Sequence, residues 1–232
     1  MTPSRRVRAA AIPLVLAALA GGCRDGADAD AAGRAAAPRG GRPAAPEIPD
    51  DAPMVAFLGD SISAGLHLPR DRAFPAALQR RLAAAGLPFR LVNAGVSGDT
   101  TAGGLARIDW ILKQKPAIVV VELGANDGLR GVPVETIEAN LREILRRVVA
   151  SGAKPLLLGM RLPPNYGPAY NAAFEEAFER VADEHDAAFL PFFMKGVAGR
   201  LDLNLEDGIH PTAEGHERLA ENVEEALLRL LR

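Results

Sequence analysis

The sequence predicts an α/β domain in which a parallel β-sheet is covered by helices on both faces. The first observation is that short apolar segments suited to buried strands alternate with longer helical segments from residue 55 to the C-terminus. Such alternation is typical of parallel sheets joined by right-handed crossovers. The second is size: 232 residues, 48% of them hydrophobic, can form one sizeable core, so we expect one folded domain without internal repeats.

Five segments are predicted as strands. The clearest is residues 117–123, because this run is apolar, rich in β-branched side chains and suited to the centre of a parallel sheet. The predicted strands are residues 55–58, 89–94, 117–123, 155–160 and 187–190.

Five helices are predicted between and after these strands. Pro133 suits a first helical position, and apolar residues then recur every three or four positions as far as Gly152. Thr212 suits the N-cap of the last helix. The predicted helices cover residues 74–85, 101–115, 133–151, about 169–186, and 212 to the C-terminus.

This topology brings four polar motifs to one edge of the sheet. Each motif follows a predicted strand, and ligands of parallel sheets bind beyond the carboxyl ends of the strands. The motifs are Gly59-Asp60-Ser61, the stretch from Asn93 to Thr100, the stretch from Glu122 to Gly128, and Asp207-Gly208-Ile209-His210-Pro211.

These motifs, in this order and at this spacing, resemble the four blocks of the SGNH, or GDSL, hydrolase family. The resemblance extends from Met54 to the C-terminal helix. It implies a single three-layer α/β/α domain with a flavodoxin-like, five-stranded parallel sheet, and a serine hydrolase that needs no cofactor.

Ser61 is the predicted nucleophile. A strand-to-helix junction leaves a serine hydroxyl free and turns backbone N–H groups towards an anion, although this stretch alone also reads as a simple helix cap. Ser63 and Ser97 are rivals, and the family pattern selects Ser61 because Gly59-Asp60-Ser61 matches the first block.

His210 is the predicted general base. It has an aspartate, Asp207, three residues before it, close enough for the carboxylate to orient the imidazole and stabilise its protonated form. A lone histidine is more often a surface or core residue, which is how we interpret His67, His185 and His216.

Acyl transfer also needs donors for the oxygen that becomes negative. The second and third family blocks imply the backbone N–H groups of Ser61 and Gly95 and the side-chain amide of Asn126. Taken singly, Gly95 is also explained by a tight turn and Asn126 by a loop. Asp99 and Asp127 are interpreted as loop-shaping groups.

No metal site is predicted. Asp60, Asp127, Asp207 and His210 supply oxygen and nitrogen atoms, but they do not have the spacing of a known metal motif.

Three further segments resemble the bacterial periplasmic acyl-CoA thioesterase/lysophospholipase/arylesterase branch: residues 121–131, 161–167 and 190–194. This implies hydrolysis of acyl thioesters, aryl and alkyl esters, and lysophospholipids at one site. Loops 128–133 and 163–170 follow two central strands, so Leu129 and Tyr166 are predicted contacts of the acyl group. The alternatives are a carbohydrate O-deacetylase and a non-catalytic lipoprotein that binds an acyl chain or glycan.

The composition excludes some classes of binding partner. A net charge of −2 without a basic stripe argues against nucleic-acid binding. The single cysteine, Cys23, excludes an intramolecular disulfide. The expected partner is a small-molecule or lipid ester, and the sequence does not indicate an oligomeric state.

The N-terminal segment is predicted to direct export. Residues 1–22 have a basic start, an apolar run too short to span a bilayer, and small residues before Cys23. This resembles a bacterial lipobox, so Cys23 is predicted to carry a lipid anchor on the periplasmic side of the envelope; cleavage after Ala20, giving a soluble periplasmic or secreted protein, is the alternative. Residues 23–52 are predicted as a flexible linker and residues 53–232 as the hydrolase domain.

Overall fold

The computed structural model describes residues 47–232. The predicted signal, Cys23 and most of the predicted linker lie outside these residues. Residues 47–52, the end of that linker, form no helix or strand. In the described part of the chain, no helix is long and apolar enough to cross a membrane.

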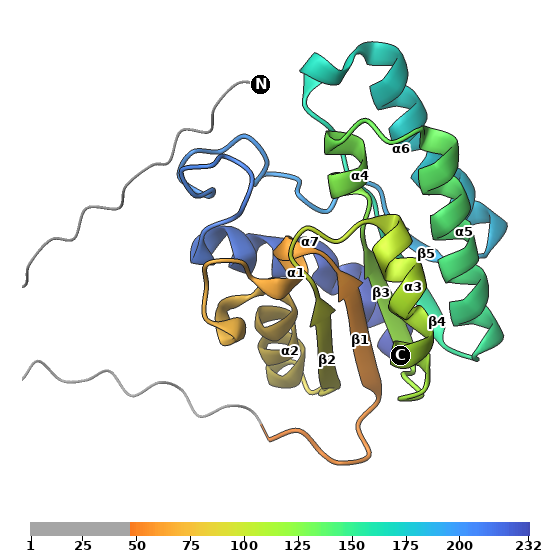
Figure 1. Ribbon diagram of the computed structural model, residues 1–232. Coiled ribbons are helices and arrows are strands. Elements are labelled where there is room, and N and C mark those ends of the chain that lie inside the picture. Colours follow the sequence, from red (N-terminus) through yellow and green to blue (C-terminus); the bar gives the residue numbers. More distant parts are fainter. Residues whose placement is uncertain (1–46) are drawn as a thin grey trace, which may run out of the picture. The chain divides into compact units, whose positions relative to one another are not determined.

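A five-stranded parallel sheet forms the centre of the domain (Figure 1). The strand order is β2-β1-β3-β4-β5, and all neighbouring strands are parallel. This confirms the predicted fold class. The strands are β1 Met54–Gly59, β2 Arg90–Gly95, β3 Ile118–Glu122, β4 Lys154–Leu158 and β5 Ala188–Leu190.

Helices cover both faces of this sheet, which gives three layers (Figure 1). Helices α2 and α7 pack together on one side, and α5 packs between α3 and α6 on the other. The long helices are α2 Phe74–Ala84, α3 Thr101–Leu112, α5 Val134–Ala150, α6 Pro168–Glu184 and α7 Ala213–Leu231. Thr212 accepts a hydrogen bond from the Gly215 N–H and so caps α7 as predicted.

Four short elements complete the fold: the helices α1 Ser61–Ala64 and α4 Ala125–Leu129, and the 3₁₀ turns η1 Arg70–Arg72 and η2 Pro164–Tyr166. The sequence did not indicate α4, whose residues were expected in a loop. Helix α3 ends three residues earlier than predicted, because Lys115 has a positive φ of 56° before Pro116.

The central strands are buried and end together at one edge of the sheet. Residues 55–58 of β1 and 119–121 of β3 have no exposed surface, as expected for central parallel strands. Gly59, the last residue of β1, is paired with Gly95 of β2 and with Glu122 of β3. Three strands therefore end at the same level, and the polar motifs that follow them share one edge.

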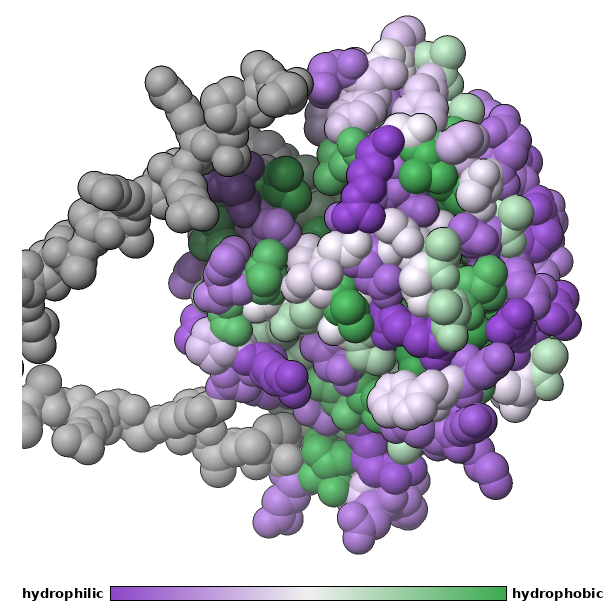
Figure 2. Space-filling model, in the orientation of Figure 1, coloured by the Kyte–Doolittle hydropathy of each residue, from purple (hydrophilic) through white to green (hydrophobic). Residues whose placement is uncertain are grey.

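The surface mixes hydrophilic and hydrophobic residues in small groups (Figure 2). Large apolar side chains that are exposed are Val96, Trp110, Val149, Leu201 and Ile209. Val96 and Ile209 belong to the second and fourth motifs, so they lie close in sequence to the predicted site.

Candidate active site

Ser61 is the first residue of α1, directly after β1 and Asp60. The Asp60 carboxylate accepts a hydrogen bond from the Ile62 N–H at 2.9 Å and caps this short helix, which Gly65 ends with a φ of 70°. The Ser61 side chain lies 2.9 Å from Nε2 of His210. The nucleophile and the base are therefore in hydrogen-bonding distance although 149 residues separate them.

His210 is oriented by Asp207 through its other ring nitrogen. Asp207 Oδ2 lies 2.6 Å from His210 Nδ1, and Oδ1 accepts the backbone N–H groups of Ile209 and His210, both at 2.9 Å. These donors, the His210 N–H first, lower the pKa of Asp207 to about 2. Asp207 therefore stays ionised at neutral pH and can stabilise an imidazolium on His210.

The loop that carries Asp207 and His210 is fixed by backbone bonds. Asn204 and Pro211 form an isolated antiparallel bridge. Around it, the Leu205 N–H donates to the His210 carbonyl at 2.8 Å, and the Thr212 N–H donates to the Leu203 carbonyl at 2.9 Å. This short paired segment holds the base in place where no sheet strand reaches.

Asn126, in α4, reaches the nucleophile turn. Its Nδ2 donates to Asp60 Oδ2 at 3.1 Å, and the amide carries a second N–H that remains free to bind an oxyanion. The backbone N–H of Ser61 makes no hydrogen bond within residues 47–232. Both groups suit the donor role that the sequence predicts.

Gly95 does not suit that role. Its N–H donates to Asn93 Oδ1 at 3.0 Å, and Asn93 Nδ2 binds the Ser63 carbonyl at 2.6 Å. A side chain at Gly95 would come within 2.3 Å of the Ala64 nitrogen. Glycine is therefore required here by the close approach of β2 to α1, and the prediction that Gly95 binds the oxyanion is not supported.

Gly98, in the same motif, has the free donor that Gly95 lacks. It has a φ of 79° in a turn closed by the Asp99 N–H and the Val96 carbonyl at 3.0 Å. Its own N–H has no partner among the described residues. Arg130, just after α4, donates to the Gly98 carbonyl at 3.1 Å, which ties this turn to the helix that carries Asn126.

Comparison with known proteins identifies this arrangement. Residues 57–218 match the model of the GDSL-like Lipase/Acylhydrolase family. The chain belongs to this family. It is 48% identical over 181 residues to Esterase TesA of Pseudomonas aeruginosa, a match that covers 78% of this chain and 90% of that protein. The crystal structure of TesA, at the same identity, superposes with a TM-score of 0.74 over 76% of this chain and 99% of that chain.

A second relative has several activities in its name. Thioesterase 1/protease 1/lysophospholipase L1 of Escherichia coli is 43% identical over 171 residues, which cover 73% of this chain and 81% of that protein. The arylesterase of Vibrio mimicus is 38% identical over 75% of this chain and 88% of its own length. The chain is accordingly an SGNH-type serine hydrolase of the esterase and thioesterase group.

The other serines of this GDSL-family site are not placed for attack. The Ser63 hydroxyl is fully buried and donates to Glu122 Oε2 at 2.7 Å. Ser97 is exposed, and no contact joins it to His210 in the described structure.

The other histidines have separate surroundings. His216 is buried, its Nδ1 accepts the Phe74 N–H at 3.1 Å, and burial lowers its pKa to about 4, so it is a neutral core residue. His67 is exposed, with its ring centroid 6.3 Å from that of His210. His185 is the C-cap of α6. His210 is the base that the geometry supports.

The loop-shaping interpretation of Asp99 and Asp127 agrees with their contacts. Asp127 accepts the N–H and the hydroxyl of Thr101 at 2.9 and 2.7 Å, which anchors the start of α3. Asp99 pairs with Arg107 at 2.7 Å. Arg107 also donates to the Gly59 carbonyl at 3.0 Å and thereby supports the end of β1.

Two carboxyl groups next to the nucleophile turn, Asp60 and Glu122, are buried, and neither was assigned a part in the reaction from the sequence. Burial raises the pKa of Asp60 to about 6. Burial, together with the charge of Asp60, raises the pKa of Glu122 well above its ordinary value. Within residues 47–232 no group of acidic, histidine or cysteine side chains is arranged to hold a metal ion.

Leu129 and Tyr166 lie together, as the prediction of a shared substrate wall requires. The Tyr166 hydroxyl donates to the Leu129 carbonyl at 2.8 Å, and the Tyr170 hydroxyl donates to the Val132 carbonyl at 2.6 Å. Both Leu129 and Tyr166 are half-buried. The two loops after β3 and β4 are therefore joined to each other.

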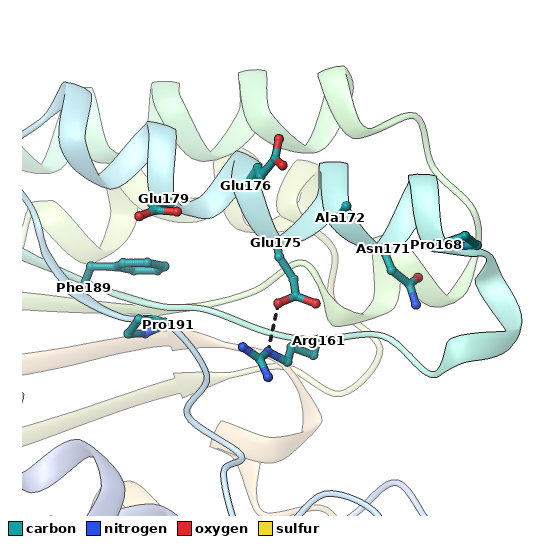
Figure 3. Close-up of a pocket in the computed structure, with 9 residues that line it drawn as sticks. All are labelled: Arg161, Pro168, Asn171, Ala172, Glu175, Glu176, Glu179, Phe189 and Pro191. Carbon is teal, nitrogen blue, oxygen red and sulfur yellow. Dashed lines mark ion pairs between the residues drawn. The ribbon is translucent and has the colours of Figure 1, made fainter.

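A pocket of about 520 Å³ lies apart from the triad, between α6 and the end of β5 (Figure 3). Glutamates 175, 176 and 179 line it. Glu175 forms an ion pair with Arg161, drawn as a dashed line in Figure 3, in which Oε2 lies 2.9 Å from Nε. Its acidic lining does not suit an acyl chain, and it contains no residue of the predicted site.

Proposed function

We propose that this hydrolase cleaves carboxylic esters and thioesters, among them aryl esters, acyl thioesters and lysophospholipids, through an acyl-enzyme on Ser61. The observation that carries the proposal is the continuous chain from Ser61 Oγ through His210 to Asp207, with separations of 2.9 and 2.6 Å. The names of the relatives support the substrate classes. None of those relatives is named as a carbohydrate deacetylase.

In the first half of the reaction, Ser61 Oγ attacks the acyl carbonyl while His210 Nε2 takes the hydroxyl proton. The carbonyl oxygen becomes negative and binds the Ser61 N–H, the free N–H of the Asn126 amide and the Gly98 N–H, which replaces Gly95 in this role. His210 then gives its proton to the departing alkoxide or thiolate. Asp207 remains ionised throughout.

In the second half, water replaces the leaving group. His210 removes a proton from the water, which attacks the acyl-enzyme, and the collapse of the second tetrahedral intermediate returns the proton to Ser61 and releases the carboxylic acid. The acyl part is proposed to lie against the wall formed by Leu129 and Tyr166. No metal or cofactor takes part in these steps.

The proposal is tested with a p-nitrophenyl alkylphosphonate and a panel of p-nitrophenyl esters, acyl-CoAs and lysophospholipids. We expect the phosphonate to label Ser61, and Ser61→Ala to abolish both labelling and hydrolysis while the far-UV circular dichroism is unchanged. Ser97→Ala is the matched control and should keep wild-type rates. Labelling at another serine, or hydrolysis by Ser61→Ala, contradicts the proposed mechanism.

We further propose that the chain is exported and carries a lipid anchor on Cys23. The support is the order of basic, apolar and small residues in 1–22. Stable anchoring requires more than one acyl chain, as lipoprotein processing supplies. Cys23→Ser should therefore move the protein out of the membrane fraction, and a mature wild-type protein that begins at Gly21 without added lipid mass would show cleavage after Ala20 instead.

A further inference from the structure

We propose that Glu122 is a positioning residue that holds the turn carrying Ser61 in the geometry for attack, an inference that rests on the proposed function. Glu122 is the last residue of β3 and is 1% exposed. It does not reach Ser61 Oγ, His210 or Asp207, so the reaction as described leaves it without a role.

One oxygen of Glu122 collects donors from both sides of the nucleophile. Oε2 accepts the Ser63 hydroxyl at 2.7 Å, the Ser63 N–H at 3.2 Å and the Asp60 N–H at 3.3 Å. Asp60 and Ser63 flank Ser61 in the chain. The Glu122 carboxyl group therefore holds the backbone on both sides of the nucleophile, at Asp60 and at Ser63.

The glycine of the first motif makes room for this arrangement. A Cβ on Gly59 would lie 2.1 Å from the Ser63 hydroxyl oxygen and 2.7 Å from Glu122 Oε2. Both distances are far shorter than non-bonded contacts allow. The absence of a side chain at Gly59 thus permits the Ser63–Glu122 pair to sit against the end of β1.

Glu122 also relates the nucleophile to the oxyanion donor. Asn126 follows it by four residues, at the start of α4, and binds the Asp60 side chain at 3.1 Å. The Asp60 backbone in turn binds Glu122. The end of β3 thereby sets the position of the Ser61 turn from one side and of the Asn126 amide from the other.

Stability alone does not account for a carboxyl group at this position. The second oxygen of Glu122, Oε1, is buried without a hydrogen-bond partner in the described structure. Desolvating a carboxyl group is costly, and apolar replacements of buried charged groups are often neutral or stabilising. Its burial next to Asp60 raises its pKa further. A glutamate at this position supplies an acceptor for the three donors from Asp60 and Ser63, and an apolar residue does not.

The test compares four variants with wild type by kcat, KM, rate of phosphonate labelling and Tm. Glu122→Ala removes the acceptor, Glu122→Gln keeps an oxygen for the three donors, and Ser63→Ala removes the hydroxyl donor alone. Val120→Ala is the matched control, because this residue of β3 is fully buried like Glu122 but pairs with Phe57 within the sheet, before the nucleophile turn begins. It should lower Tm and leave kcat within about two-fold.

We expect Glu122→Ala to lower kcat and the labelling rate by about 10- to 100-fold with KM within about two-fold, because misplacing a reacting group by about 1 Å can cost about 100-fold in rate. Glu122→Gln should restore kcat to within about five-fold of wild type, since its amide oxygen accepts the same donors. Ser63→Ala should lower kcat about three- to ten-fold.

Several results overturn the inference. One is a Glu122→Ala variant that is folded and labelled at the wild-type rate; another is an equal fall in kcat for Val120→Ala. If Glu122→Ala does not fold, Ser63→Ala decides, and a wild-type kcat for that variant overturns the proposal. Wild-type protein that does not react at Ser61 contradicts the proposed function itself, which separates the two failures.

Discussion

Asp207 and Asp60 both lie one hydrogen bond away from a group that the reaction uses, but their surroundings are opposite. The Asp207 side chain is 40% exposed and receives two backbone N–H groups and the imidazole, which lower its pKa to about 2. Asp60 is 2% exposed, and its burial raises its pKa to about 6. Hydrogen-bond donors and exposure to water stabilise the charge of Asp207, whereas burial disfavours a charge on Asp60.

This difference assigns separate tasks to the two carboxyl groups. Asp207 acts through its charge, because it must stay ionised while His210 becomes an imidazolium. Asp60 acts through its shape and hydrogen bonds, since it caps α1 and holds Asn126. A neutral group with similar acceptors can replace the second but not the first.

The largest expected effect is on kcat, when each of the two aspartates is replaced by asparagine in a separate variant. Asp207→Asn should lower kcat by about 10³- to 10⁴-fold, because the amide neither stabilises the imidazolium nor fixes its tautomer. Asp60→Asn should lower kcat by only about 10-fold, the scale of a disturbed hydrogen bond. Steady-state kinetics with p-nitrophenyl butyrate measures both, and equal losses in the two variants would break the distinction between charge and geometry.

The second prediction concerns how Asp60 changes the free energy of unfolding with pH. The folded-state pKa of Asp60 is raised from 3.8 to about 6, which corresponds to roughly 3 kcal/mol. Its contribution is therefore greatest below pH 3.8 and is lost as the pH rises through 6. Relative to wild type, Asp60→Asn should gain up to about 3 kcal/mol of unfolding free energy between pH 4 and pH 7, as measured by urea titrations. A difference that does not change with pH would show that Asp60 carries no buried charge.

His216 should change the free energy of unfolding with pH in the direction opposite to Asp60. Its folded pKa is lowered from 6.5 to about 4 by burial, so its contribution is present above pH 6.5 and lost as the pH falls through 4. The size is again about 3 kcal/mol. Between pH 4 and 6, Asp60 and His216 therefore change the free energy of unfolding in opposite directions. His216→Gln should be more resistant to acid, relative to its own stability at pH 7, than wild type. The same urea titrations test this, and a variant as acid-sensitive as wild type contradicts it.

The parts of the site that the sequence predicts well are those set by local spacing. Asp207 and His210 share one tight turn, and Ser61 stands at a strand-to-helix junction, so short motifs locate them. The fold class follows from alternating strands and helices for the same reason. Residues 125–129 were missed as a helix because one turn is too short to show a period.

The parts that the sequence did not predict depend on contacts between distant residues. Whether the Gly95 N–H is free depends on the Asn93 side chain, which the approach of β2 to α1 directs towards it. Glu122 reads as the end of an apolar strand, and its role follows from Ser63, 59 positions earlier in the chain. Gly98 was visible as a glycine in the second motif, but its free N–H was not.

The smallest effect should be on the choice of acyl chain. Tyr166→Phe removes the hydrogen bond to the Leu129 carbonyl, worth about 0.5–1.5 kcal/mol, and loosens the proposed acyl wall while leaving the triad untouched. We expect the ratio of kcat/KM for p-nitrophenyl dodecanoate to that for the butyrate to change about three- to ten-fold, the range of a few contacts in an apolar pocket. Leu129→Ala should shift the same ratio, because it shortens the wall directly.

Tyr170→Phe is the matched control, since it loses an equivalent hydrogen bond, to the Val132 carbonyl, and leaves the hydrogen bond to Leu129 in place. An unchanged chain-length profile in both Tyr166→Phe and Leu129→Ala would place the acyl group elsewhere on the sheet edge, and a shift confined to Tyr170→Phe would move it towards Val132.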